Sequence, residues 1–151
     1  MTGIAIARER PDTADAMQLI GELEAALSPL YAVESQHGYS VEKLIREDVH
    51  FFVARVDGVP AACGGIQFYP GFGELKRMFV RDAWRGRGLG FAMLQHLAAH
   101  ARANRCALLR LETGVHQHAA IRLYERWGFL KIDPFPPYKP DPVSLCYEKW
   151  I

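Results

Sequence analysis

The sequence predicts an α/β fold built on one mixed sheet. Runs rich in β-branched and aromatic residues alternate with stretches in which apolar residues recur at helical spacing. Three of the strand-like runs, between residues 49 and 81, are separated by short turns, which predicts antiparallel neighbours. The passage from residue 74 to residue 111 instead contains a strand, a helix and a strand, which requires a crossover and a parallel pair. With 151 residues, we expect one domain, 1–151.

The N-terminal third is predicted to supply one strand and two helices. Residues 4–8 have the composition of a short strand. Pro11-Asp12-Thr13 is a helix-start sequence, and the apolar residues that follow keep helical spacing until Ser28-Pro29. Ser40 is a good N-cap residue, so a second, shorter helix should begin after it.

The middle of the chain predicts a hairpin and an irregular third strand. Asp57-Gly58 separates two apolar runs and suits a turn in which both residues have positive φ. The third strand, over 74–81, contains Leu75, Met78 and Val80, whose spacing breaks the two-residue period. An extra residue near Lys76-Arg77, a β-bulge, would put all three on one face. Such a bulge is either an ordinary irregularity or a way to free backbone groups for a ligand.

The C-terminal half continues the alternation of helices and strands. An amphipathic helix is expected from 89 to about 104 and a second helix over 117–127, ended by Gly128. Strands are expected at 107–111, 129–133 and 145–150, the last two around a proline-rich loop.

Composition excludes several classes of function. The net charge of +1 provides no global field that would attract nucleic acid or an anionic membrane. The three cysteines form no paired motif, which favours a reducing compartment. No apolar run approaches the roughly 20 residues of a membrane-spanning helix, and no signal peptide is apparent. We therefore expect a cytoplasmic protein without nucleic-acid or membrane partners. A homodimer is one candidate for its oligomeric state.

The segment Arg85-Gly86-Arg87-Gly88-Leu89-Gly90 lies between a predicted strand and a predicted helix. A helix N-terminus presents unpaired N–H groups and a partial positive charge, and glycines let an anion approach the backbone closely. Two arginines add donors that suit phosphate oxygens. A diphosphate ligand therefore explains these residue types, although a plain helix entry remains the alternative. The dinucleotide and Walker fingerprints are both absent.

This segment and its flanks resemble the central motif of the GNAT superfamily of N-acetyltransferases. That motif, Arg/Gln-x-x-Gly-x-Gly/Ala, is filled by Arg85, Gly88 and Gly90, after the strand 74–81. Downstream, Leu111-Glu112-Thr113 and residues 120–129 are similar to the second motif of the family. The resemblance covers roughly residues 74–129.

The resemblance implies a sheet with splayed fourth and fifth strands, about four helices, and acetyl-coenzyme A between the strands. Its pyrophosphate would lie on the glycine segment, its pantetheine arm along the third strand of the meander, and the reacting oxyanion near a backbone N–H of Met78–Phe79. Gln117 stands where many members carry Asn. The implied cofactor-binding residues are Met78, Phe79, Val80, Arg85, Gly86, Arg87, Gly88, Leu89, Gly90 and Gln117.

The resemblance also indicates catalytic residues. Tyr124 matches the tyrosine that acts as general acid in the family, with packing between helix and sheet as the alternative. Glu112 and Glu74 lie on the two strands that flank the implied cleft and are candidates for the general base. Each could equally be a solvated strand carboxylate or an ion-pair partner of Arg77 or Arg110. The sequence does not distinguish between the two carboxylates.

The acceptor is expected to be an amine of a small molecule or peptide, bound by the irregular segments 28–39 and 134–142. Tyr31 and Tyr138 are the substrate-binding candidates in these segments. His96 and His100 lie one helical turn apart but lack a third ligand, so no metal is expected. A non-catalytic module that binds acyl-coenzyme A is the alternative function.

Overall fold

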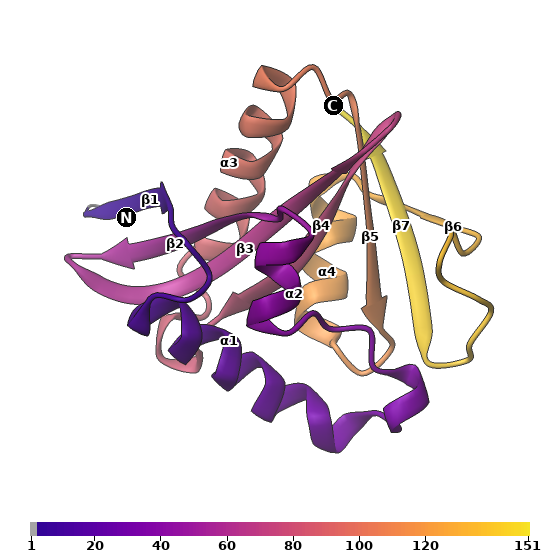
Figure 1. Cartoon of the computed structure of the whole chain (residues 1–151), viewed down its shortest axis with the longest axis horizontal. Helices are drawn as coiled ribbons and strands as arrows, with labels where there is room; N and C mark the ends of the chain where they lie inside the picture. Colours follow the sequence, from indigo (N-terminus) through magenta and orange to yellow (C-terminus); the bar gives the residue numbers. More distant parts are fainter. Residues whose placement is uncertain (1–2) are drawn as a thin grey trace.

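The computed structural model describes residues 3–151 and is organised around a seven-stranded sheet (Figure 1). The strand order is β1-β2-β3-β4-β5-β7-β6. All neighbouring strands are antiparallel except β4 and β5, which are parallel, so the predicted mixed sheet is confirmed. The strands are β1 (Ile4–Arg8), β2 (His50–Val56), β3 (Val59–Tyr69), β4 (Phe72–Val80), β5 (Leu108–Gly114), β6 (Leu130–Ile132) and β7 (Ser144–Trp150).

Helices cover both faces of the sheet, with α1 and α2 in front of it in Figure 1 and α3 and α4 behind. The Thr13 hydroxyl accepts a hydrogen bond from the Ala16 N–H, and the Ser40 hydroxyl accepts one from the Lys43 N–H, as expected of N-caps. The helices are α1 (Ala14–Leu27), α2 (Val41–Arg46), α3 (Leu89–Ala103) and α4 (His118–Trp127), with 3₁₀ turns at Ser28–Leu30, Val33–Ser35 and Asp82–Trp84.

The two faces have separate hydrophobic cores. Leu19 of α1 and Leu44 of α2 pack against Phe51 of β2 on the front face. Met93 of α3 and Tyr124 of α4 belong to the larger cluster on the other face. Burial of apolar surface on both sides of the central strands fixes which side chains point toward each helix layer.

The predicted hairpin and bulge are both present. Asp57 and Gly58 have φ of 50° and 82°, as the turn requires. In β4, the two residues Arg77 and Met78 lie opposite the single residue Gly64 of β3, and Arg77 has a φ of 57°. The bulge therefore reverses the alternation of side chains along β4.

This reversal decides which face each β4 side chain occupies. Leu75, Met78 and Val80 all contact the core cluster on the α3 face, as the bulge was expected to achieve. Glu74 and Lys76, which flank Leu75, consequently point toward the α1 face. Around the bulge, the strand thus presents apolar residues to the α3 layer and charged residues to the α1 layer, and beyond it Phe79 packs on the α1-side core.

The fourth and fifth strands splay apart. β4 and β5 pair only at Gly73–Leu109 and Glu74–Arg110, whereas β5 stays paired with β7 as far as Gly114. Beyond Glu74, the edge of β4 that faces β5 has no strand partner among the described residues. The divergence opens the sheet between its two helix layers.

Candidate active site

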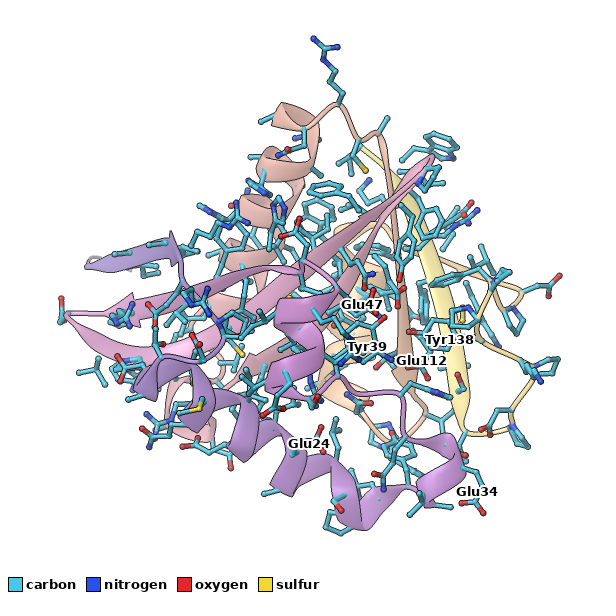
Figure 2. All side chains as sticks on the ribbon, viewed as in Figure 1. Glu24, Glu34, Tyr39, Glu47, Glu112 and Tyr138 are labelled. Atoms are coloured by element: carbon cyan, nitrogen blue, oxygen red, sulfur yellow. The ribbon has the colours of Figure 1, made fainter. Side chains whose placement is uncertain are left out.

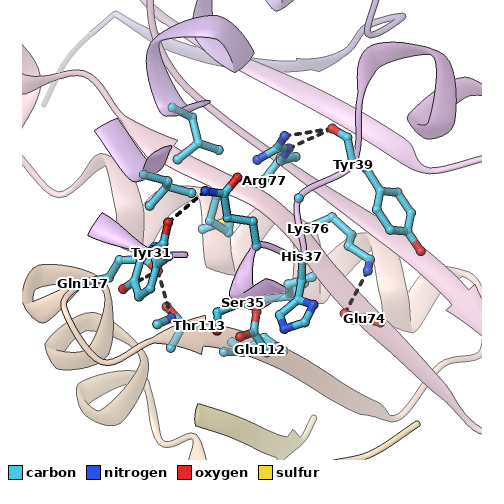
Figure 3. A pocket seen from close by; sticks show the side chains of 18 of the residues that line it. Tyr31, Ser35, His37, Tyr39, Glu74, Lys76, Arg77, Glu112, Thr113 and Gln117 are labelled. Carbon is cyan, nitrogen blue, oxygen red and sulfur yellow. Dashed lines mark hydrogen bonds and ion pairs between the residues drawn. The ribbon is translucent and has the colours of Figure 1, made fainter. Parts of the chain in front are cut away.

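A pocket lies at the divergence of β4 and β5 and is lined from both faces of the sheet (Figure 3). Met78 and Tyr124 line it from the side of α3 and α4. Glu74, Lys76 and Glu112 line it from the side of α1. The pocket therefore connects the two helix layers through the sheet.

Glu112 of β5 is a largely buried carboxylate in this pocket. It follows Leu111, which belongs to the α3-side core, so alternation directs Glu112 toward the α1 side. The Ser144 hydroxyl donates a hydrogen bond of 2.7 Å to Glu112 Oε2. Burial raises the pKa of Glu112 above its usual range, and the Glu74 carboxylate adds to that shift, while the Ser144 hydrogen bond and His37 oppose it. A carboxyl group with a raised pKa is better suited to accept a proton near neutral pH.

Glu74 is in a different environment, because one of its oxygens is already occupied. The residue is 1% exposed. Its Oε2 lies 2.9 Å from Lys76 Nζ and accepts a hydrogen bond of 2.5 Å from the Tyr138 hydroxyl. Its Oε1 is buried and has no hydrogen-bond partner among the described residues. A buried carboxylate oxygen in a pocket wall is an acceptor for a ligand's N–H group.

Lys76 is enclosed by the same group of residues. Its side chain is 7% exposed, and its Nζ lies 4.0 Å from the centre of the Tyr39 ring and donates a hydrogen bond of 3.2 Å to Tyr138 Oη. Burial and the neighbouring Glu74 raise the pKa of Tyr138, which keeps its hydroxyl protonated as a donor. The predicted substrate-binding Tyr138 therefore shapes this part of the pocket.

Tyr124 enters the pocket from α4 on the opposite face. The residue is 6% exposed, and its ring meets the edge of the Phe129 ring with centroids 5.7 Å apart. Burial, and to a smaller extent the negative charge of Glu112, raise the pKa of Tyr124, so the phenol is protonated at neutral pH. No hydrogen bond within residues 3–151 uses its hydroxyl. Tyr124 thus both packs in the core and keeps a proton to donate.

The glycine segment at the start of α3 has the features of an anion cradle. Gly86 and Gly88 have φ of 76° and 80°, and a Cβ at either position would meet nothing within 4 Å. Across the described chain, no hydrogen bond uses the backbone N–H groups from residue 86 to residue 91. The Arg87 guanidinium lies 5.0 Å from the Trp84 ring, and Arg85 Nε donates to Val80 O at 3.2 Å. These donors and the open space fit a diphosphate group.

Two residues of the segment have structural reasons for their identity. Leu89 is 1% exposed in the α3-side core, so only its backbone faces the cradle. A Cβ on Gly90 would lie 2.7 Å from Leu123 Cδ2, so the close packing of α3 on α4 favours glycine there, and a larger residue would force the Leu123 side chain to move. The prediction that Leu89 and Gly90 bind the cofactor therefore concerns their backbone N–H groups and not their side chains.

Gln117 and Tyr31 are linked to each other at the junction between β5 and α4. Gln117 Oε1 accepts a hydrogen bond of 2.8 Å from the Gly114 N–H, and Tyr31 Oη lies 3.4 Å from the same oxygen. The His116 N–H donates to Tyr31 Oη at 3.1 Å. The Gln117 amide nitrogen is therefore the group left for a ligand, and Tyr31 connects the acceptor-side segment to this junction.

Three pocket residues, Lys76, Arg77 and His37, were not assigned a functional role from the sequence. Arg77 donates to the Tyr39 carbonyl through Nε at 3.1 Å and Nη2 at 2.9 Å, and it also pairs with Glu24 of α1. His37 lies edge-on to Tyr138 with ring centroids 5.2 Å apart. Arg77 and Lys76 lie at the predicted bulge. Two adjacent charged residues in a strand of a sheet covered on both faces could have indicated that they line a pocket. Nothing in the sequence pattern distinguished His37.

The histidine pair on α3 is part of a different cluster. His100 Nε2 lies 2.8 Å from His50 Nδ1, a hydrogen-bond distance. Within residues 3–151, no group of three His, Cys, Asp or Glu side chains is arranged to hold a metal ion. None of the described helices is long and apolar enough to cross a membrane.

Comparison with known proteins identifies the family. The model of the acetyltransferase (GNAT) family matches residues 18–129. The chain belongs to the GNAT family of acetyltransferases. This GNAT chain is 43% identical over 151 residues to an IAA acetyltransferase of Azospirillum brasilense, covering 99% of each chain. The resemblance inferred from the motifs is thereby confirmed, and the protein is an acetyl-coenzyme A-dependent acetyltransferase.

Solved structures support the same assignment. The crystal structure of a protein described as an acyl-CoA N-acyltransferase from Klebsiella pneumoniae has a TM-score of 0.83 and 37% sequence identity, and 97% of each chain is covered. PaiA N-acetyltransferase from Thermoplasma acidophilum, solved in complex with coenzyme A, shares the fold with a TM-score of 0.74 at 18% identity, over 97% of this GNAT chain and 99% of that one.

Proposed function

We propose that this enzyme transfers the acetyl group of acetyl-coenzyme A directly to a primary amine of a small molecule or peptide. The observation that carries the proposal is the meeting of two complementary groups in one pocket. Glu112, a carboxyl group with a raised pKa, enters from the α1 side, and Tyr124, a protonated phenol, enters from the α4 side. Acyl transfer to an amine needs a proton acceptor and a proton donor on opposite sides of the reacting carbonyl.

The donor is proposed to bind on the α3 side of the splayed strands. The N–H groups from residue 86 to residue 91 and the arginines Arg85 and Arg87 would hold its pyrophosphate. The unpaired edge of β4 at Met78, Phe79 and Val80 would hydrogen-bond the pantetheine arm like an added strand. A protein of the same fold, the Thermoplasma enzyme, was solved in complex with coenzyme A, which supports the choice of ligand.

Glu112 is the better of the two candidate bases. An alkylammonium with a pKa of about 10.4 must lose a proton before it can attack. Glu74 Oε2 is already engaged by Lys76 and Tyr138, whereas Glu112 receives only a neutral hydroxyl from Ser144 among its hydrogen bonds. We therefore assign proton removal to Glu112. The free Oε1 of Glu74 would accept an N–H of the bound amine.

Tyr124 and the β4 backbone act on the other side of the reacting carbonyl. The Tyr124 hydroxyl would protonate the departing thiolate, and its unused hydrogen-bonding capacity supports that role. A backbone N–H at Met78–Phe79, on the unpaired edge of β4, would stabilise the oxyanion. Tyr138 and Tyr31 would contact the acceptor, because both line the α1-side part of the pocket.

A panel of amines assayed with acetyl-coenzyme A tests this function. Release of free thiol is followed with each amine, using Tyr124→Phe and Glu112→Gln as matched controls. We expect at least one amine to give turnover well above hydrolysis of the thioester, and both variants to suppress it. If coenzyme A binds tightly but no amine is acetylated, the chain is a binding or sensing module on this fold.

A further inference from the structure

Lys76 is a primary amine inside the proposed acceptor pocket. It extends from β4 toward the α1 face, and it lines the same cavity as Glu112 and Tyr124 (Figure 3). The side chain is 7% exposed, and its Nζ is held by Glu74 Oε2 at 2.9 Å and Tyr138 Oη at 3.2 Å. A buried lysine in this position has the functional group that the reaction consumes.

The position of Lys76 brings its amine within reach of the reacting centre. Met78, whose backbone borders the proposed thioester site, is two positions further along β4, and a strand advances about 3.3 Å per residue. The lysine side chain is a flexible four-carbon stem that can swing along the strand. The pocket is continuous from Lys76 to Met78 and Tyr124, so this movement does not require crossing the sheet backbone.

The groups around Lys76 also suit its deprotonation. Glu74 contacts the ammonium directly, and the second oxygen of this carboxylate is buried without a partner among the described residues. The charge of Lys76 is also felt at Glu112, where it lowers the carboxyl pKa against the larger effect of burial. The lysine is therefore surrounded by the acceptors that an external ammonium would meet.

We propose that the enzyme acetylates its own Lys76 when no external amine fills the pocket. The inference rests on the proposed function, since it uses the same donor and the same pocket. The Lys76 ammonium passes one proton to Glu74, and the neutral nitrogen forms a bond to the acetyl carbon as the carbon–sulfur bond breaks. Glu112 takes the second nitrogen proton, Tyr124 protonates the thiolate, and one of the two protons held by the carboxylates returns to Tyr124. The products are N-acetyl-lysine, coenzyme A and one proton released to solvent.

Acetylation changes the pocket in a defined way. It removes the positive charge beside Glu74, which leaves this buried carboxylate with the Tyr138 hydroxyl as its hydrogen-bond donor. It also replaces the cation that lies 4.0 Å from the Tyr39 ring with a neutral amide. The acetylated enzyme should therefore bind a cationic acceptor differently from the unmodified enzyme.

Exposed lysines provide an internal control for uncatalysed acetylation. Lys131 and Lys139 are solvent-exposed, and Lys139 directly follows the pocket residue Tyr138. Chemical transfer from a thioester in solution favours such accessible amines over one that is buried in an ion pair. A preference for Lys76 therefore requires that the folded site directs the reaction.

The test incubates the full-length enzyme with acetyl-coenzyme A in the absence of an amine and follows intact mass and peptide maps. We expect one acetyl group at Lys76, formed at least about tenfold faster than at Lys131 or Lys139 because the reaction is intramolecular. Its rate should not depend on protein concentration and should fall with excess coenzyme A and in the Glu112→Gln variant. Lys76→Arg should show only the slow labelling of the exposed lysines.

The same samples are assayed for turnover with an accepted amine, which separates the two proposals. Normal turnover together with an unmodified Lys76, or with labelling confined to Lys131 and Lys139, overturns the inference and leaves the proposed function intact. Specific labelling of Lys76 that an accepted amine suppresses supports both. Labelling of Lys76 at an unchanged rate in Glu112→Gln overturns the assigned proton path.

Discussion

The two sides of the splayed sheet are built from different kinds of structural element. On the α3 side, the proposed donor site consists largely of backbone: positive-φ glycines, the first turn of a helix and an unpaired strand edge. On the α1 side, the proposed acceptor site consists of side chains from distant parts of the chain. Glu112, Tyr39 and Tyr138 meet there from a strand and two irregular segments (Figure 2).

The difference explains which part of the site can vary. A backbone cradle requires a few glycines at fixed spacing, so it leaves a recognisable motif in the sequence. A pocket made of side chains on irregular segments can change its lining without altering the sheet. The bulge at Arg77 joins the two sides, because it turns Met78 toward one helix layer while Lys76 faces the other.

Replacing Tyr124 with Phe tests the chemistry of the donor side. The hydroxyl is lost while the ring keeps its packing against Phe129. We expect single-turnover acetyl transfer to slow by about 10²-fold or more, with the affinity for coenzyme A nearly unchanged. Thermal unfolding serves as the control and should move little. Full activity would restrict Tyr124 to a packing role.

Two alanine substitutions separate binding from packing within the glycine segment. Gly88→Ala places a side chain at a φ of 80° in open space, so its main effects should be backbone strain of about 1–2 kcal/mol and weaker binding of coenzyme A. Gly90→Ala places a Cβ 2.7 Å from Leu123 Cδ2 and should chiefly lower the melting temperature. Calorimetric titration and thermal melts of both variants distinguish the two cases. Equal affinities for coenzyme A in the wild type and in Gly88→Ala would contradict the proposal that this segment binds the pyrophosphate.

Tyr138→Ala and Tyr31→Ala compare the two acceptor-side segments. Tyr138 contacts Glu74 and Lys76, so its loss should raise KM for the amine and leave KM for acetyl-coenzyme A nearly unchanged. Tyr31 also accepts a hydrogen bond from the His116 N–H and contacts Gln117. Its loss should therefore raise KM for the amine and, to a smaller degree, KM for acetyl-coenzyme A. Steady-state kinetics with each substrate varied decides this. If both variants weaken only the donor, the acceptor pocket lies elsewhere.

The smallest expected effect concerns stability in acid and lies outside both sites. Burial lowers the pKa of His50, His96 and His100, and Arg8 lowers it further at His50 and His100, whereas Asp48 acts in the opposite direction at His50. The folded chain therefore favours neutral imidazoles, while the unfolded chain titrates near 6.5. The contribution of these histidines to the free energy of unfolding should be complete above that pH. It should be lost as the pH falls through their lower pKa values in the folded chain. Melting temperatures measured between pH 7.5 and about 5 test this, with His100→Asn expected to flatten the slope.

The sequence predicted most of the fold because its local signals were strong. The Asp57-Gly58 turn, the Thr13 and Ser40 caps and the β4 bulge each depend on neighbouring residues, and each is present. β4 begins at Phe72, two residues before the predicted start at residue 74, so only Pro70-Gly71 separates it from β3. The placement of β7 between β5 and β6 was not predicted, because it depends on contacts far apart in the sequence.

The candidate site was predictable only in part for the same reason. The glycine segment, Glu112 and Tyr124 belong to motifs with fixed spacing, so the sequence pointed to them. Glu74 pairs with Lys76 and also accepts a hydrogen bond from Tyr138, which lies 64 residues further along the chain. No local sequence pattern predicts this contact with Tyr138. The hydrogen bond from the Gly114 N–H to Gln117 Oε1 was likewise not predictable, because it depends on how the chain turns between β5 and α4.

The pH dependence of kcat in three enzymes shows whether a base on the α1 side and an acid on the α4 side act together in acetyl transfer. These are the wild type, Glu112→Gln and Glu74→Gln, each saturated with acetyl-coenzyme A and an accepted amine. We expect wild-type kcat to fall in acid as Glu112 is protonated, at a pH above the 4.5 of an unperturbed glutamate. Glu112→Gln should lose this acid limb and about 10²-fold in kcat, whereas Glu74→Gln should keep the limb. Loss of the limb in Glu74→Gln and its retention in Glu112→Gln would instead identify Glu74 as the base.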